Sequence, residues 1–491
     1  MRRLPISWTT VSTQLGLQRK RKQRPQHGER TRRSRFEPLE ARQMLAVLLV
    51  NSPANDSLPN DGYVTLREAV AAAWSNTATD LGHTGSGTDT ITFDESLFAS
   101  GPATITLTSK IDVNSNLTIE GPGADLLIIS GGDATRVFED FYNVFVTLSG
   151  ISVVDGFASD EGGPDSRGGG IYNGSGHLVV EGVEFRGNTA TTNGGAIYSV
   201  GGSLTVLNST FHDNQAGTGG AIYASSGTLT IRNSTFDENG AGSGGAIYTS
   251  SGTSGTHSQI INSTFSNNSG VALYIPGSAY IDVINSTLTA NTGISLPGGI
   301  YRSFTSQTVT LHNTIVAGNT GSGGAASDLG ANGFSTASSY NLIGVTTSTA
   351  FGDDGNQVIG SAAPGLTPLG NYGGPTKTHA LLPDSLAINA GSDAVAVGAV
   401  LLFDQRGAGY QRALGSAVDI GATEAWIREL TDGSVEIYGT DGNDTITVAS
   451  DEVTHSAFGE LEIDLSAVPE VRVFGENGDD VLVLDHSWID G

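Results

Sequence analysis

The chain has 491 residues, of which 37% are hydrophobic and 68 are glycine, and it contains no cysteine. Disulfide frameworks, thiolate nucleophiles and cysteine-ligated metals are therefore excluded, and the regular apolar content argues against disorder. Residues 1–42 hold 12 of the 24 Lys and Arg residues and only three acids, which leaves 12 basic against 47 acidic residues in the body. A body this acidic disfavours nucleic acid and anionic membrane as partners.

The basic head, residues 1–46, is interpreted as an export or targeting segment that is disordered or removed, and a nucleic-acid-binding arm is the alternative. Its end, Phe36–Ala46, resembles the Leu-Glu-Pro-Arg-type N-terminal element of exported planctomycete proteins. That resemblance implies a protein outside the cell or on its surface. The apolar run Met44–Val50 is too short to span a bilayer, so no transmembrane helix is predicted.

Residues 47–103 are predicted to form an N-terminal cap. The segment Gly62–Ala69 is similar to the Cys-Ser-Leu-Arg-Glu-Ala element of many bacterial surface proteins, with Val64 in place of the Cys and Thr65 in place of the Ser. One short helix is expected, from Thr65 to Trp74. It would cover the open strand edges at the N-terminal end of the central region.

The central region, residues 104–345, is repetitive. A Gly-Gly-x-Ile-Tyr block recurs, and an Asn-Ser-Thr-Phe block recurs in step with it. The tyrosines that end the first block are 25 to 27 residues apart: Tyr172, Tyr198, Tyr223, Tyr248, Tyr274 and Tyr301. Segments such as Leu204–Val206 alternate apolar and polar residues, as half-buried strands do. The region is therefore predicted to be all-β, a right-handed three-faced parallel β-helix with about one coil per repeat.

In that arrangement equivalent residues of successive coils form columns. Ile197, Ile222 and Ile247 are expected inside, Asn208 and Asn233 are expected to form a turn ladder, and paired glycines are expected at corners with positive φ. The repeats resemble those of polymorphic outer-membrane proteins and, more broadly, pectate-lyase-like β-helices.

Residues 346–425 carry long motifs, among them Leu366–Thr376, Ala387–Gly391, Asp404–Gly407 and Asp419–Ala422. These closely resemble the choice-of-anchor domain, type Q, of bacterial surface proteins. The resemblance implies a domain that follows a β-helix, and it is expected to cover the last coil.

The tail, residues 426–491, contains two fragments, Gly439–Thr447 and Gly475–Val483, that resemble RTX-type repeats. In such repeats turn carbonyls and an Asp carboxylate bind Ca²⁺ between successive turns. The resemblance makes Asp441, Asp444, Asp479 and Asp480 candidate Ca²⁺ ligands. Both fragments lack the second Gly and they are widely separated, so plain Asp-Gly turns remain the alternative.

Two surface columns are candidate binding sites. When the coils are aligned on their Phe residues, Arg186, His212 and Asp237 share one column, with Asp213 and Glu238 beside it. This patch is suited to a cation or a uronic acid, and a solvated loop face is the alternative. Tyr198, Tyr223 and Tyr248 form a ladder that would stack either on sugar rings or only on itself.

The sequence thus predicts a monomeric, exported surface or secreted β-helix that is adhesive, carbohydrate-contacting or envelope-structural, with polysaccharide or cell-envelope components as partners. The alternative is a polysaccharide lyase or glycoside hydrolase that acts on acidic polysaccharide. No lysine lies between Lys110 and Lys377, so Arg is expected to be the only strongly basic candidate for proton abstraction on the coils.

Overall fold

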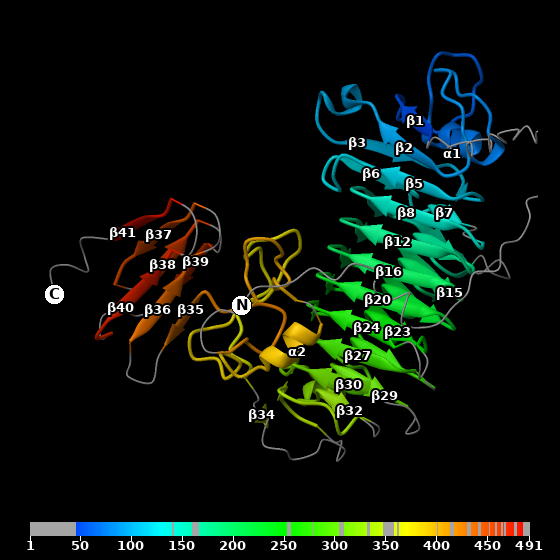
Figure 1. Ribbon diagram of the computed structural model, residues 1–491. Helices are drawn as coiled ribbons and strands as arrows, with labels where there is room; N and C mark the ends of the chain where they lie inside the picture. The colour runs from blue at the N-terminus through cyan, green and yellow to red at the C-terminus, as the bar shows by residue number, and fades with distance from the viewer. Residues whose placement is uncertain are drawn as a thin grey trace, which may run out of the picture. The chain divides into compact units, whose positions relative to one another are not determined.

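The computed structural model describes residues 46–139, 142–159, 166–252, 257–277, 279–303, 309–330, 334–346, 358–360, 363–399, 401–412, 417–429, 434–439, 443–450, 452–456, 459–462, 465, 468–475 and 479–484. The described residues between 46 and 360 form a parallel β-helix, whose strands lie in successive layers in Figure 1. Every strand pair in its sheets is parallel, and equivalent residues of neighbouring repeats face each other, as in Ile197↔Ile222.

Three long sheets and one short sheet form the walls. Sheet 1 contains β1 (Ala46–Val50), β2 (Asp89–Phe93), β5 (Leu117–Glu120), β8 (Phe145–Ser149), β12 (His177–Glu181), β16 (Ser203–Leu207), β20 (Thr228–Arg232), β24 (Ser258–Ile261), β27 (Ile281–Ile284) and β30 (Val309–His312). Sheet 2 contains β3 (Ala103–Thr106), β6 (Leu127–Ser130), β9 (Ser152–Val154), β13 (Glu184–Arg186), β17 (Thr210–His212), β21 (Thr235–Asp237), β25 (Thr264–Ser266), β28 (Thr287–Thr289), β31 (Ile315–Val316), β33 (Leu342–Ile343) and β34 (Val358–Ile359).

Sheet 3 contains β4 (Ile111–Asp112), β7 (Phe138–Glu139), β11 (Ile171–Asn173), β15 (Ile197–Val200), β19 (Ile222–Ser225), β23 (Ile247–Thr249), β26 (Leu273–Ile275), β29 (Ile300–Arg302) and β32 (Leu329–Gly330). Sheet 4 lies between sheets 2 and 3 in chain order and contains β10 (Phe157–Ala158), β14 (Thr189–Asn193), β18 (Gln215–Thr218) and β22 (Gly240–Ser243). The three long sheets are the three faces that the sequence predicted, and in four coils a short strand of sheet 4 is added between sheets 2 and 3.

The interior is built from columns of identical side chains. Ile197, Ile222 and Ile247 are fully buried, as predicted. The Phe rings of sheet 2 stack with centroids 4.7 to 4.8 Å apart, which is the spacing of hydrogen-bonded strands. Because each ring fills the same position one coil further on, the repeat buries a continuous core that one repeat alone cannot form.

The structure contains a second, buried asparagine ladder in addition to the turn ladder that the sequence predicted. It consists of the Asn residues that follow sheet 2: Asn188, Asn214, Asn239, Asn268, Asn291 and Asn319. Within it, Asn214 Nδ2 donates to Asn239 Oδ1 at 2.9 Å, and Asn239 Nδ2 donates to Asn268 Oδ1 at 3.0 Å. Asn208 and Asn233 form the predicted turn ladder at the corner between sheets 1 and 2, where φ is 48° and 51° and Asn233 Nδ2 donates to Asn208 Oδ1 at 3.2 Å. Asn tolerates this left-handed conformation better than most residues, which explains its recurrence there.

A helix covers the first coil, close to the predicted bounds. Helix α1 (Leu66–Ser75) begins after Thr65, which forms a capping box with Glu68. Its buried residues, including Leu66 and Val70, join the core formed by Leu48 of β1 and Ile91 of β2. A second helix, α2 (Asp393–Gly398), was not predicted, because six residues are too few to show an apolar period. Two short 3₁₀ helices, Glu95–Phe98 and Ser322–Gly324, also lie in the described residues, in which no helix is long and apolar enough to cross a bilayer.

We call the described residues between 363 and 425 the lateral segment, because they pack along the side of sheet 2. Hydrogen bonds of outward threonines join it to three successive coils: Thr235 Oγ1 donates to the Lys377 carbonyl at 2.5 Å, Thr264 Oγ1 to Gln405 Oε1 at 2.6 Å, and the Ala422 amide to Thr287 Oγ1 at 3.0 Å. Outward threonines on sheet 2 thus supply hydrogen-bonding partners that hold the lateral segment along the side. The segment also reaches the last coils, where Leu381 and Ile420 share an apolar cluster with Ile315 and Leu342. That it covers the open strand edge of the last coil stays a prediction.

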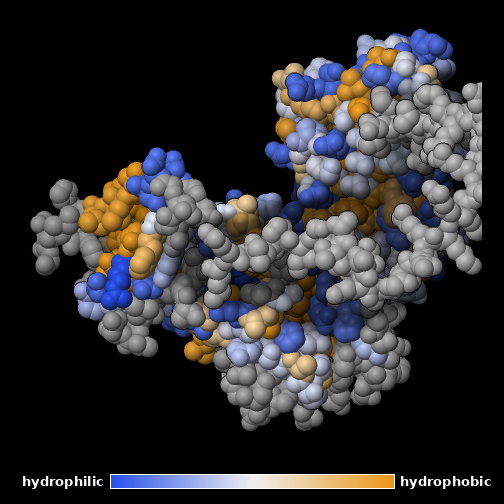
Figure 2. Space-filling view, in the orientation of Figure 1, coloured by the Kyte–Doolittle hydropathy of each residue, from blue (hydrophilic) through white to orange (hydrophobic). Residues whose placement is uncertain are grey.

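The tail forms small sheets of its own from β35 (Ile427–Glu429), β36 (Val435–Tyr438), β37 (Thr445–Val448), β38 (Glu452–His455), β39 (Gly459–Glu462), β40 (Val471–Phe474) and β41 (Val481–Leu484). Strand β36 pairs in parallel with β40, and β37 with β41, so the two RTX-like fragments stack as successive turns. All four residues of β41 are exposed and apolar, and an apolar patch covers this part of the tail in Figure 2.

Candidate functional site

The candidate site lies on the outer face of sheet 2. Each of β13, β17 and β21 has three residues with a buried Phe in the middle, so the residue on either side of the Phe points outward. The observed register places Arg186 opposite His212 and His212 opposite Asp237, as the Phe alignment predicted. It also forms a second column, one residue before each Phe, in which Glu184 lies opposite Thr210 and Thr210 opposite Thr235.

The lateral segment divides this face into a covered part and an open part. Thr235 is fully buried because the chain near Lys377 packs against it. Thr210 and Glu184, one and two coils nearer the N-terminus, are only half-buried. The open part of sheet 2 is thus a polar surface with the lateral segment as its wall.

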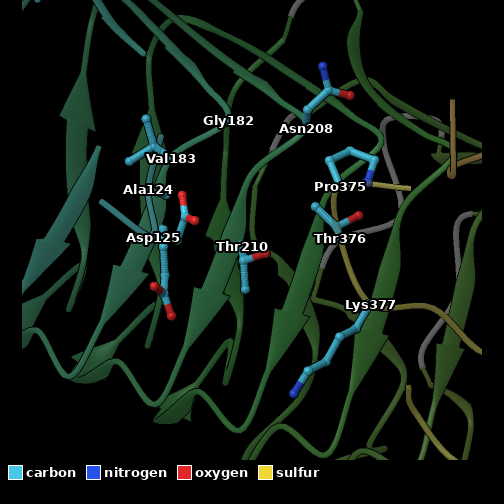
Figure 3. A pocket seen from close by; sticks show the side chains of 10 residues that line it. Ala124, Asp125, Gly182, Val183, Asn208, Thr210, Pro375, Thr376 and Lys377 are labelled. Carbon is cyan, nitrogen blue, oxygen red and sulfur yellow. The ribbon is translucent and has the colours of Figure 1, made fainter. Parts of the chain in front are cut away.

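A pocket of about 500 Å³ lies where this open surface meets the wall. Carboxylates of Asp125 and Glu184, the Thr210 hydroxyl and the Lys377 side chain line it, together with Ala124, Gly182, Val183, Asn208, Pro375 and Thr376. Figure 3 shows Lys377 extending from the lateral segment back toward the strands of sheet 2. The polar groups of the pocket therefore include two carboxylates, one ammonium group, two threonine hydroxyls and one asparagine amide.

Within the pocket Glu184 is held from two sides. The Ser152 hydroxyl donates to its Oε2 at 3.1 Å, and Arg186 Nε lies 3.6 Å from its Oε1. Arg186, one of the predicted site residues, is exposed beside the pocket and serves as this ion-pair partner. The sequence did not single out Asp125, Glu184 or Lys377. Lys377 in particular corrects the expectation that only Arg could supply a strong base here, since a residue distant in sequence is brought to the coils.

His212, Asp237 and Glu238 form a compact cluster next to the pocket. His212 Nδ1 lies 3.4 Å from Asp237 Oδ2, and His212 Nε2 lies 3.8 Å from Glu238 Oε2. Asp237 is buried, whereas Glu238 is exposed at a corner with φ of 56°. Asp213 occupies the equivalent corner one coil earlier, with φ of 52° and an exposed side chain, and is not part of this cluster.

The six tyrosines of the first repeat block form one ladder on the outside of sheet 3. Neighbouring ring centroids are 4.9 to 5.4 Å apart, and Arg136 and Arg167 lie over the rings of Tyr172 and Tyr198. Burial raises the pKa of Tyr198 and of Tyr248. The ring faces of Tyr198, Tyr223 and Tyr248 are thus turned to one another, which is the geometry of a structural stack.

In the tail, stacking brings the candidate Ca²⁺ ligands into neighbouring turns. The Asp444 amide donates to Asp480 Oδ1 at 3.0 Å, and the Asp479 amide donates to Asn443 Oδ1 at 2.9 Å. Asp444 is buried, with its Oδ1 3.8 Å from His455 Nε2. Burial lowers the pKa of His455 to about 4. The fourth candidate, Asp441, lies outside the described residues.

A second pocket, of about 550 Å³, lies between sheet 1 and α2. Arg232, Asp282 and His312 contribute its charged and titratable groups, and burial lowers the pKa of His312. Asp282 is already paired, because His257 Nδ1 lies 3.0 Å from its Oδ2. No site residue predicted from the sequence lines this pocket.

The family model described as "right handed beta helix region" matches residues 103–257, which include β13, β17 and β21. A comparison with curated proteins finds no match. The family match and the parallel register of the long sheets together show that the chain is built on a right-handed parallel β-helix.

Proposed function

We propose that this chain is an exported surface or secreted β-helix protein that contacts polysaccharide through the pocket on sheet 2. The observation that carries the proposal is the lining of that pocket, in which carboxylates, hydroxyls, an amide and an ammonium group converge on a volume of about 500 Å³. Binding pockets for small ligands have similar volumes and a few convergent polar groups. Sugar hydroxyls both donate and accept hydrogen bonds, so they match such a mixed lining.

The rigid wall of stacked coils supports this proposal. Glu184 and Thr210 are held on strands β13 and β17, whose central Phe residues are fully buried, so these two groups lose little freedom when a ligand binds. Lys377 and Arg186 provide positive charge at the pocket within an otherwise acidic body. An oligosaccharide with a carboxylate would place that group near Lys377.

A polysaccharide lyase is the second candidate, and Lys377 is the observation that favours it. A lyase needs a base that removes the proton next to the uronic carboxylate, and a lysine amine is one of the groups that serve as such a base. Glu184 and Asp125 would serve a glycoside hydrolase instead, as the paired carboxylates that such enzymes use.

Binding is tested by calorimetric titration of the full chain with neutral and uronic acid-containing oligosaccharides, in the presence of a chelator. Glu184→Gln and Lys377→Met should each weaken binding at least tenfold. Glu181→Gln, an exposed change on β12 of sheet 1, is the matched control and should bind as the wild type does. Equal binding by all four proteins would refute the pocket as the site.

The same oligosaccharides distinguish binding from catalysis. A lyase product contains a new carbon–carbon double bond that absorbs in the ultraviolet, and a hydrolase product contains a new reducing end. Binding without either signal supports the non-enzymatic function. Protease treatment of intact cells that produce the chain tests export, because only an extracellular protein is degraded while the cells remain whole.

We also propose that the tail binds Ca²⁺ between its stacked turns. Asp444 and Asp480 stand in adjacent turns linked by a hydrogen bond, and hard oxygen ligands on Gly-rich turns are the ligand type that Ca²⁺ prefers. Only two turns stack in parallel here, so we expect weak binding, of about millimolar Kd as in extracellular modules.

A further inference from the structure

We propose that His212, Asp237 and Glu238 bind a divalent transition-metal ion such as Zn²⁺. One ligand atom from each of the three side chains lies within 4.8 Å of the other two. Ligand atoms around tetrahedral zinc are about 3.3 Å apart, since each lies about 2 Å from the metal. His212 Nδ1 and Asp237 Oδ2, at 3.4 Å, already have this separation. Glu238, whose side chain is 58% exposed, has room to turn toward them.

The buried carboxylate of Asp237 is a separate observation that points to a cation. Asp237 is only 6% exposed, and among the described residues no lysine or arginine lies within ion-pair distance of it. Burying a carboxylate is unfavourable unless a positive charge or several hydrogen bonds compensate it. The groups that approach Asp237 are the neutral amide of Asn267 and the imidazole of His212, and the imidazole of His379 interacts with it electrostatically. None of these groups carries a permanent positive charge, so a bound cation would complete the surroundings of Asp237.

The site is also organised in the way that metal sites are. Asn267 Nδ2 donates to Asp237 Oδ1 at 3.0 Å, which leaves Oδ2 directed at the imidazole. A hydrogen bond to the second atom of a ligating group commonly fixes its orientation in metal sites. The three ligands come from two adjacent coils, so the register of the β-helix holds them together.

The chemistry of the ligands selects the class of metal. Imidazole suits Zn²⁺ and other transition metals, whereas Ca²⁺ takes six to eight oxygen ligands. Three protein ligands leave a fourth position open, as in zinc sites that accept water or a substrate group. His212 and the pocket residue Thr210 share strand β17 and both point outward, so a ligand in the pocket can reach that position. This last step rests on the proposed polysaccharide function, whereas the metal site itself does not.

The experiment is calorimetric titration of the metal-free full chain with Zn²⁺, without any sugar, repeated with Co²⁺, whose visible absorption reports on its ligands. We expect one site on the coils. It should be lost in His212→Gln and in Asp237→Asn, and weakened about tenfold in Asn267→Ala. Asp213→Asn is the matched control, because it removes a neighbouring exposed carboxylate from the equivalent corner and should leave binding unchanged.

Glu238→Asn guards against a variant that fails to fold. Position 238 has φ of 56°, which Asn adopts more readily than Glu, so this change removes a ligand without burdening the backbone. Its Zn²⁺ affinity should fall at least tenfold while its melting temperature is maintained. Zn²⁺ binding that persists in folded Asp237→Asn and Glu238→Asn, or that falls equally in Asp213→Asn, would overturn the proposal. Because sugar binding is measured with a chelator present, its outcome is independent of this one.

Discussion

The buried asparagine ladder makes a quantitative prediction about stability. In the coil that contains β21, the Asn239 side chain donates to the carbonyls of Phe211 and Asp237 and to Asn268 Oδ1. Its Oδ1 accepts from the backbone amide and the side-chain amide of Asn214, at 3.1 and 2.9 Å. Asn239→Ala removes all of these hydrogen bonds at a position with no solvent exposure.

The expected loss follows from the groups left behind. The Asn214 backbone amide loses its side-chain acceptor, and the remaining partners lose one of their hydrogen bonds each. A buried donor or acceptor left unsatisfied costs about 1–3 kcal/mol. We count this cost in full for the Asn214 backbone amide and in part for each of the other groups. The free energy of unfolding should therefore fall by about 3–5 kcal/mol.

The assay is guanidinium unfolding of the full chain followed by circular dichroism, in which the midpoint should fall while the slope stays constant. Asn208→Gly is the matched control. It replaces an Asn of the neighbouring corner, where φ is 48°, and removes only the hydrogen bond from Asn233 at 3.2 Å. Since Gly accepts a positive φ, the control should change stability by less than about 1 kcal/mol. An Asn239→Ala protein as stable as the control would refute the ladder as a main source of stability.

Four further predictions follow from other parts of the molecule. Phe236→Ala should lower the free energy of unfolding by about 3–5 kcal/mol, because it empties one position of a stacked column, and Phe236→Leu should cost clearly less in the same guanidinium assay. The tail should lose stability in acid. Burial lowers the pKa of His455 from 6.5 to about 4, so the unfolded tail takes up a proton at this residue before the folded tail does. The free energy of unfolding should therefore be highest above pH 6.5 and fall by about 3 kcal/mol as the pH falls toward 4. His455→Gln should remove this part of the pH dependence of the tail's melting temperature, and an unchanged profile would contradict it. Ca²⁺ at millimolar concentration should raise the melting temperature of the tail in the wild type but not in Asp480→Asn, and a shift of the β-helix transition instead would place the ion elsewhere. Truncation before residue 363 should destabilise the coils from β21 to β31 more than the N-terminal coils, because it uncovers Thr235, Thr264 and Thr287. Hydrogen exchange of the backbone amides measures this difference between coils.

Much of the coil architecture could be predicted from the sequence, because a solenoid is a local structure repeated. Each side chain contacts its equivalent in the next repeat, so the spacing of the Phe residues already implied the register that places Arg186, His212 and Asp237 in one column. Helix α1 was predictable for the same local reason, since Thr65 and Glu68 cap it within four residues of chain. The turn ladder of Asn208 and Asn233 was predicted, but the buried Asn ladder was not, because both Asn sets recur with the same period and only the backbone conformation separates corner from interior.

The parts that carry the proposed chemistry required tertiary structure. Lys377 reaches sheet 2 only because the lateral segment folds back along the coils, and no periodic signal marks where a non-repetitive segment will pack. In the tail, the two RTX-like fragments are 36 residues apart in sequence, yet β36 and β40, like β37 and β41, pair directly. Short-range periodicity therefore determined the coils and one column of the site. The pocket depends on contacts between segments distant in sequence, which are selected by the packing free energy of the whole fold and leave no regular pattern in the sequence.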